Sequence, residues 1–401
     1  MSIAPLMPVY PRCGVRPVRG DHCHLIDEDG TRYLDFASGI AVNLLGHSHE
    51  GLIGAIQRQA ATLMHVSNLY GSPQGEALAQ KLVDHTFADT AFFTNSGAEA
   101  VETAIKTARA YYQHAGNEER YELITFKNAF HGRTMATISA SNQEKMHKGF
   151  MPLLPGFQYA EFDNLDHAKS LMSDKTAGFL VEPIQGEGGL NAASDAWMQG
   201  VAKLAKKLGA LLIVDDIQSG CGRTGTYFAF EKAGIEPDMI TQAKSLSGFG
   251  LPFAALLIKP EHDIWKPAEH NGTFRGNTHA FVTARVAIEK FWKDKTFETE
   301  LQAKTTLLTT GLQDLAALIP GATLKGRGLM QGVDTGSGDL AGAICARAFE
   351  KGLVIETSGA DDEVVKVLAP LTTPDDTFRK GFAILLDAAR EVTETNKIAA
   401  E

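Results

Sequence analysis

The sequence has few of the features that mark membrane, secreted or metal-binding proteins. Only 4 of its 401 residues are cysteines, and Cys13, Cys23, Cys221 and Cys345 lack the spacing of a metal site or a disulfide framework. No stretch of about 18 apolar residues occurs. The N-terminus has no basic segment followed by an apolar one. We therefore expect free thiols, no bound metal, no membrane partner and a cytoplasmic location.

Clustered positive charge is also missing. The formal net charge is -10, and no basic run or interleaving of basic with aromatic residues offsets it. Because such a chain repels phosphate backbones, nucleic acid is excluded and a small-molecule partner is favoured. A hydrophobic content of 44% with 21% charged residues can bury a large core. This length and composition predict one large domain with a smaller companion.

Short apolar runs alternate with helical patterns along the chain. The runs are residues 91–93, 123–126, 178–181, 211–214, 239–241 and 254–258. This rhythm predicts an α/β fold with a mostly parallel central sheet and helices on both faces. No linker composition marks the domain edges. We expect residues 1–50 to join a smaller α+β domain formed by residues 301–401, and residues 51–300 to form the large domain.

Two charged residues stand at the ends of predicted buried strands. Lys244 follows the apolar stretch 237–243, and Asp215 follows residues 211–214. Open α/β sheets build their sites at such ends. A lysine amine and a carboxylate are what Schiff-base catalysis with pyridoxal phosphate requires: the amine bonds to the cofactor aldehyde, and the carboxylate keeps the pyridine nitrogen protonated. Taken alone, the pair also fits a lysine whose stem covers apolar surface and an aspartate that caps a helix or turn.

A small-residue turn indicates a phosphate site. After the strand at 91–93, Ser96, Gly97 and Ala98 lead directly into a helical pattern. Free backbone N–H groups and the helix dipole at such a turn suit a phosphate. A P-loop is excluded because its Gly-Lys-Ser/Thr ending is missing. An ordinary strand-to-helix turn is the alternative.

Loops after two other predicted strands carry candidate pocket residues. Phe130 is a flat aromatic that can stack on a cofactor ring, and Arg133 can hold a substrate carboxylate by a bidentate pair. His131 is either a proton shuttle or a structural pocket wall. Glu182 is a candidate structural turn acid, and Glu187 a candidate pocket acid.

Together these segments resemble the class III aminotransferases of fold type I over almost the whole chain. Ser-Gly-Ala-Glu, Phe-His-Gly-Arg-Thr, Glu-Pro-Ile-Gln-Gly-Glu, Asp-Asp-Ile-Gln with Gly-Arg-Thr-Gly, and Ala-Lys occur in that family's order and spacing. The resemblance implies that Lys244 bonds to pyridoxal phosphate, that Asp215 partners the pyridinium and that Gln218 contacts the phenolic oxygen. The other cofactor-binding residues it implies are Ser96, Gly97, Ala98 and Phe130.

A further segment, His270-Asn271-Gly272-Thr273, looks like the family's stretch whose threonine reaches the phosphate in the neighbouring subunit. The resemblance therefore implies a homodimer with shared active sites, to which Thr273 contributes.

The resemblance divides along the chain. Up to about Gly188 the chain looks like an acetylornithine aminotransferase, through residues 34–43 and 46–49. From about Ala193 the chain looks more like the diaminobutyrate aminotransferases of ectoine synthesis. The residues that carry this second likeness are 214–223, 269–277 and 354–359. A natural fusion, a chimera or an unusual subgroup would each produce this pattern.

The same division affects the substrate. Arg133 belongs to the acetylornithine pattern, whereas Asp216, Gly272 and Lys366 stand where that subgroup has Glu, Ser and Arg. Lysine is a point charge without the planar fork of arginine.

We expect an aminotransferase that moves the terminal amine of N-acetylornithine to 2-oxoglutarate, giving an aldehyde and glutamate. Arg133, Glu187 and Lys366 are its expected substrate-binding residues. Diaminobutyrate is the alternative donor, so the pathway would be arginine or ectoine biosynthesis. An aminomutase would differ because it releases no glutamate. A non-catalytic cofactor-binding protein is disfavoured because the lysine and the aspartate are both present.

Overall fold

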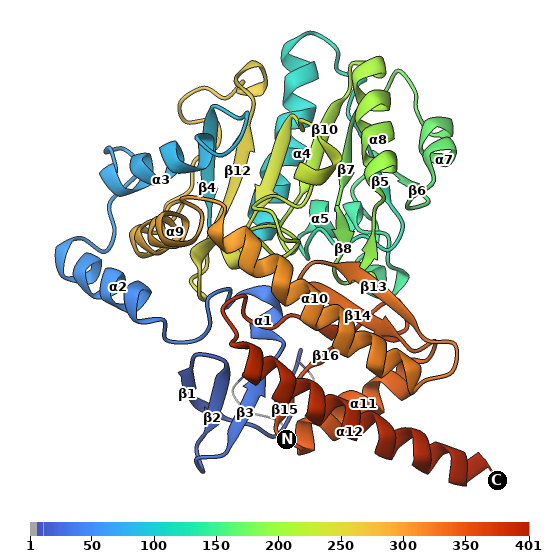
Figure 1. Cartoon of the computed structure of the whole chain (residues 1–401). Helices are drawn as coiled ribbons and strands as arrows, with labels where there is room; N and C mark the ends of the chain where they lie inside the picture. The colour runs from blue at the N-terminus through green and yellow to red at the C-terminus, as the bar shows by residue number, and fades with distance from the viewer. Residues whose placement is uncertain (1–5, 11, 401) are drawn as a thin grey trace.

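A seven-stranded sheet forms the centre of the protein in the computed structural model, which describes residues 6–10 and 12–400, with side chains as far as residue 395. Its strand order is β4-β12-β11-β10-β7-β5-β6 (Figure 1). The strands are β4 (Thr90–Thr94), β5 (Glu122–Phe126), β6 (Phe157–Ala160), β7 (Thr176–Val181), β10 (Leu211–Asp215), β11 (Met239–Gln242) and β12 (Ala254–Ile258).

All six predicted strands are confirmed, and the sheet is mostly parallel as expected. Neighbours from β11 to β6 pair in parallel, whereas β12 runs antiparallel to both β11 and β4. The seventh strand, β6, was not predicted. Its sequence, Phe-Gln-Tyr-Ala, is short and only partly buried at the sheet edge, so its apolar signal is weak.

Helices cover both faces of this sheet. Successive residues of β10 belong to different apolar clusters: Leu211 packs with α4 (Gly97–His114), and Leu212 packs with α8 (Asp195–Leu208). Since successive strand residues point to opposite faces, both faces are buried. The other elements of this part are α2 (Glu50–Thr62), α3 (Pro73–Val83), α5 (Met135–Ala140), α6 (Glu144–His147), α7 (Leu165–Ser170), α9 (Thr278–Phe291), η1 (Glu231–Ala233), η2 (Lys244–Ser247), η3 (Pro260–His262), β8 (Ile184–Gln185) and β9 (Asn191–Ala192).

Two smaller sheets flank the central one. One has the order β13-β14-β17-β16 and packs against the first two of three C-terminal helices; the other joins β1, β2 and β3 to β15. The strands are β1 (Pro17–Asp21), β2 (His24–Asp27), β3 (Arg32–Asp35), β13 (Thr323–Arg327), β14 (Met330–Asp334), β15 (Leu353–Val354), β16 (Glu356–Ser358) and β17 (Val364–Val367). The helices are α10 (Thr296–Ala317), α11 (Gly338–Glu350) and α12 (Asp375–Ala400), and a short helix α1 (Ser38–Ala41) follows β3.

The parallel pairing of β3 with β15 brings the N-terminal segment beside the C-terminal part of the chain (Figure 1). This contact supports the proposal that residues 1–50 join the smaller domain. The exact domain boundaries near residues 50 and 300 stay a prediction.

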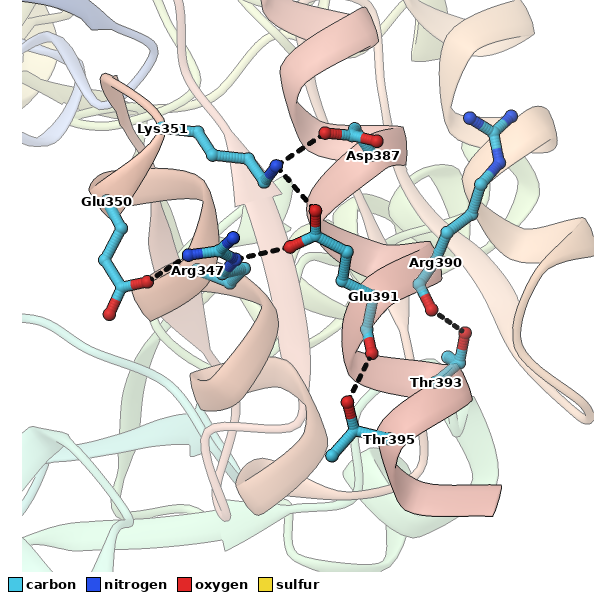
Figure 2. A network of polar contacts seen from close by, with 8 residues as sticks. All are labelled: Arg347, Glu350, Lys351, Asp387, Arg390, Glu391, Thr393 and Thr395. Carbon is cyan, nitrogen blue, oxygen red and sulfur yellow. Dashed lines mark hydrogen bonds and ion pairs between the residues drawn. The ribbon is translucent and has the colours of Figure 1, made fainter. Parts of the chain in front are cut away.

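A network of ion pairs joins α11 to α12 (Figure 2). Lys351 Nζ lies 2.6 Å from Asp387 and 2.8 Å from Glu391, and Arg347 contacts both Glu391 and Glu350. These groups are largely exposed to solvent, where ion pairs stabilise little. The network therefore orients the two helices, while the apolar core beneath them supplies most of the stability.

Among the described residues, no helix is both long enough and apolar enough to span a membrane. All four cysteines are free thiols, as the sequence predicted.

Candidate active site

A cavity of about 470 Å³ is lined by residues that follow β4, β5, β7, β10 and β11. The carboxyl ends of parallel strands meet at one edge of a sheet, which is where such a site is expected. The expected site residues in its lining are Ser96, Gly97, Ala98, Phe130, Arg133, Glu187, Asp215, Gln218 and Lys244. Two expected residues, Thr273 and Lys366, do not line it.

Lys244 is the first residue of η2 and comes two residues after the end of β11. Its backbone has a φ of 48°, a conformation that non-glycine residues seldom adopt. Burial lowers the pKa of its amine, although the carboxylates of Glu187 and Asp215 oppose this effect. A lysine with a lowered pKa supplies a neutral, nucleophilic amine more readily at physiological pH.

Asp215 is buried at the end of β10, and both of its oxygens accept hydrogen bonds. Oδ1 accepts from Thr241 Oγ1 at 3.0 Å and from the backbone N–H of Ile217 at 3.2 Å. Oδ2 accepts from Nδ1 of the buried His131 at 2.7 Å. Such a set of donors holds the carboxylate in one orientation.

Burial alone would lower the pKa of His131, but the hydrogen bond that it donates to Asp215 and the charges of Asp215 and Glu182 raise it. His131 belongs to the cavity lining and holds Asp215 through this hydrogen bond, which supports the alternative of a structural pocket wall. Nothing in the sequence indicated the pairing, because the two residues lie 84 positions apart.

The turn before α4 leaves backbone donors free. Ser96 Oγ accepts from the N–H of Glu99, whereas the N–H groups of Gly97 and Ala98 have no partner within the helix. A Cβ added at Gly97 would stand 2.9 Å from Cδ1 of Ile217, so only glycine fits without a shift. An anionic group is well placed at this turn.

Phe130 and Arg133 lie together on the cavity wall. The backbone N–H of Phe130 donates to Glu182 at 2.9 Å, and the guanidinium carbon of Arg133 lies 5.6 Å from the Phe130 ring centre. Burial and the charge of Asp215 raise the pKa of Glu182 to about 8, although His131 lowers it. Glu182 thus contacts the turn at Phe130 and lines the cavity, as Arg133 also does.

Glu187 lies between the cavity and Lys366. Its Oε1 accepts from Gln218 Nε2 at 2.9 Å and from Lys366 Nζ at 3.1 Å. Burial alone would raise the pKa of Glu187, but Lys366 and Lys244 lower it to about 2. The Lys366 side chain is fully buried behind this carboxylate and lies 3.1 Å from a second one, Glu356.

The role of Glu356 was missed in the sequence. It lies opposite Lys366 in the β16–β17 ladder, a pairing that depends on strand register and so left no local signal.

Thr273 lies in an exposed loop outside the cavity of its own subunit. The preceding Gly272 accepts a hydrogen bond through its carbonyl from Asn68 at 3.1 Å, and the ring of His270 stacks 5.4 Å from that of Phe92. The role of Thr273 across a subunit boundary stays a prediction.

A family model described as Aminotransferase class-III matches residues 10–389. The chain belongs to this family. A diaminobutyrate–2-oxoglutarate transaminase from Vibrio cholerae is 42% identical over 90% of this chain and 92% of its own length. An acetylornithine aminotransferase from Brucella melitensis is 39% identical over 99% of this chain and 98% of its own. The family, the fold and the enzyme class expected from the sequence are thereby confirmed.

Solved structures agree with this assignment. The N-acetylornithine aminotransferase from Stenotrophomonas maltophilia superimposes with a TM-score of 0.81 at 33% identity, covering 98% of each chain. The ornithine aminotransferase from Toxoplasma gondii gives a TM-score of 0.90 at 27% identity, covering 97% of this chain and 93% of its own. Another structure of that enzyme records pyridoxal phosphate at its active site.

The cofactor of this class III aminotransferase is pyridoxal phosphate, and the cavity residues fit it. Oε1 of Gln218 is buried without a partner among the described residues, which leaves an acceptor for a cofactor group. The turn at Gly97 and Ala98 would hold the phosphate, Asp215 the ring nitrogen and Lys244 the aldehyde. When bound, the cofactor supplies a carbonyl that exchanges amines and a ring that withdraws electrons.

Proposed function

We propose that the protein moves the terminal amine of N-acetylornithine to 2-oxoglutarate, giving an aldehyde and glutamate. The observation that carries this proposal is the placement of two cationic side chains around Lys244. Arg133 faces the cavity openly, whereas Lys366 is screened by Glu187. A donor with a single remote carboxylate needs only the first cation, but glutamate has two carboxylates and needs both.

Each of the cavity residues has a separate role in the proposed reaction. Lys244 moves a proton to and from the reacting carbon once its amine is free, a role worth on the order of 10²–10⁴ in rate. Asp215, oriented by His131, stabilises positive charge opposite its buried carboxylate. Phe130 would pack against the cofactor ring, Gln218 would provide a polar contact beside Glu187, and Arg133 would bind the α-carboxylate of the donor.

Diaminobutyrate is the second candidate donor. Lys366, which departs from the acetylornithine pattern, and the 42% identical diaminobutyrate transaminase both favour it. Acetylornithine stays first because Arg133 and Phe130 belong to the half of the chain that resembles the acetylornithine enzymes and lie together at the cavity. The reaction would belong to arginine biosynthesis in the first case and to ectoine biosynthesis in the second.

A homodimer with shared active sites is part of the proposal. Around the loop that carries Thr273, large apolar side chains are exposed, including Leu69, Tyr70 and Phe274. Leu69 is 88% exposed, so nearly all of its apolar side chain is in contact with water. A second copy covering this surface would bury it and bring Thr273 to the other subunit's cofactor phosphate. A cytoplasmic location is also proposed, since the four cysteines are unpaired.

The test is glutamate release from 2-oxoglutarate over a panel of donors. Acetylornithine is expected to give the highest kcat/KM, with diaminobutyrate next. A higher value for diaminobutyrate would assign the second function. Amine transfer within one donor without glutamate would indicate an aminomutase and overturn the proposal, as would absence of turnover with every donor.

A further inference from the structure

Two carboxylates from different segments of the chain lie beside the ammonium group of Lys366. Glu187 reaches it from the segment that follows β8, while Glu356 reaches it from β16, the strand that pairs directly with β17. Glu356 and Lys366 are opposite each other in that antiparallel ladder, so their side chains share one face of the small sheet. Both carboxylates lie 3.1 Å from Nζ.

No ligand in the cavity can reach Lys366 while Glu187 stays in place. The lysine side chain is fully buried, and its Nζ also lies 3.5 Å from the carbonyl oxygen of Gly186. Glu187 lines the cavity and stands between it and the lysine. A second carboxylate on the acceptor must therefore replace Glu187 at Nζ.

During that replacement, the buried ammonium of Lys366 is for a time without the carboxylate of Glu187. Once Glu187 has turned away and before the acceptor carboxylate arrives, a buried ammonium without a partner would be strongly destabilised or would lose its proton. Glu356 removes this problem because it belongs to the same sheet as Lys366 and stays beside it when Glu187 leaves.

We propose that Glu356 is a positioning residue that keeps Lys366 charged and in place while Glu187 is exchanged for the acceptor's second carboxylate. This inference rests on the proposed function, because it concerns the half-reaction with 2-oxoglutarate. In the donor half-reaction Glu187 keeps its contact with Lys366, so Glu356 has no separate task there.

The charges around Lys366 agree with this role. Burial alone would lower the pKa of Lys366, but Glu356 first and Glu187 second raise it. The other titratable groups in this network are Lys244 across the cavity and Cys345 on α11 behind Glu356. Without Glu356, Glu187 would be the one carboxylate beside Lys366 among the described residues. Glu187 must move away from Lys366 when the acceptor binds, so the lysine would then lack a counter-charge.

The test measures the two half-reactions separately in the intact holoenzyme, by single-turnover spectroscopy with the donor and then with 2-oxoglutarate, from pH 6.5 to 10. Glu356→Gln should lower kcat/KM for 2-oxoglutarate on the order of 10- to 100-fold and change the donor half-reaction less than about twofold. The loss should grow as pH rises, because Lys366 then gives up its proton within the measured range. Glu350→Gln removes the same charge from an exposed position on α11 and should change neither half-reaction.

Glu356→Asp keeps the charge but moves it away from Nζ, so it should show a smaller acceptor-specific loss with the wild-type pH range. If Glu356→Gln does not fold, Glu356→Asp still tests the role of Glu356. Equal losses in both half-reactions, or a loss that is independent of pH, would overturn the role of Glu356. Failure of the proposed function is distinguished from this outcome because it would already show in the wild type, as an absence of turnover with 2-oxoglutarate.

Discussion

His131 donates a hydrogen bond from Nδ1 to Oδ2 of Asp215 across 2.7 Å, and both side chains are buried. The carboxylate expected to face the cofactor nitrogen is therefore held in place by a buried imidazole. Thr241 fixes its other oxygen at 3.0 Å. This arrangement makes the geometry of Asp215 independent of the cofactor, so the effect of its charge can be tested separately from its position.

Asp215→Asn should still bind pyridoxal phosphate but lose most of its proton-transfer rate. The amide has nearly the same shape, yet it cannot carry the negative charge that stabilises the protonated ring nitrogen. Cofactor absorbance and single-turnover rates measure the two properties. Asp174→Asn, the same change at an exposed position, is the control. Near-normal turnover in Asp215→Asn would show that another carboxylate has this role.

Lys244 should be the residue to which the cofactor is covalently attached. Borohydride reduction of the purified protein followed by peptide mapping should find the pyridoxyl group on Lys244, because its amine lines the cavity and burial lowers its pKa. Lys244→Ala treated in the same way should carry no label. Label on any other lysine of the wild type would refute the assignment.

Thr273 should act across a dimer interface. In a hybrid of Lys244→Ala and Thr273→Ala subunits, one site lacks both groups and the other retains both. Mixing the two weakly active variants should therefore recover up to about half of the wild-type activity per hybrid, as enzyme assays and size-exclusion chromatography can measure. A monomer that remains fully active at working concentration would contradict the shared site.

Arg133 and Lys366 should affect different half-reactions. Arg133→Ala removes the open cation and should damage both, by roughly 2–5 kcal/mol in kcat/KM. Lys366→Ala should damage mainly the glutamate half-reaction, because Glu187 screens the lysine when a donor with one carboxylate is bound. Arg133→Lys keeps the positive charge but loses the planar guanidinium, so its kcat/KM should lie between those of the wild type and Arg133→Ala. If Arg133→Ala leaves the donor half-reaction unchanged, the C-terminal half of the chain sets the specificity.

Asp216 should make stability depend on pH. It is buried, and burial raises its pKa to about 8, although hydrogen bonds from Ser219 and Ala229 lower it. Between about pH 4 and pH 8 the folded state holds a proton that the unfolded state releases, so stability falls as pH rises through that window.

Asp216→Asn mimics the protonated carboxyl and can keep both hydrogen bonds. Its Tm should fall from pH 5 to pH 8 by several degrees less than that of the wild type, measured by calorimetry. Asp174→Asn should follow the wild-type slope. Parallel slopes for all three proteins would show that Asp216 is ionised in the folded state.

Much of this protein could be predicted from its sequence, because the relevant signals are local. Apolar runs identified six strands of the central sheet, and their ends located Lys244 and Asp215. A strand-to-helix turn identified Gly97 and Ala98 in the same way. These properties depend on a few neighbouring residues, since hydrophobic periodicity, turn chemistry and strand ends are encoded within short segments.

Other features were decided only by tertiary structure. The pairing of β3 with β15, the contact of His131 with Asp215 and the opposition of Glu356 to Lys366 each join segments through packing or strand register. Register has no local code, because shifting a strand by one residue moves its whole side-chain set to the other face without changing its sequence. The sequence by itself therefore determined most of the chemical groups that line the cavity, whereas the folded structure determined that Lys366 lies outside it and which charges surround that lysine.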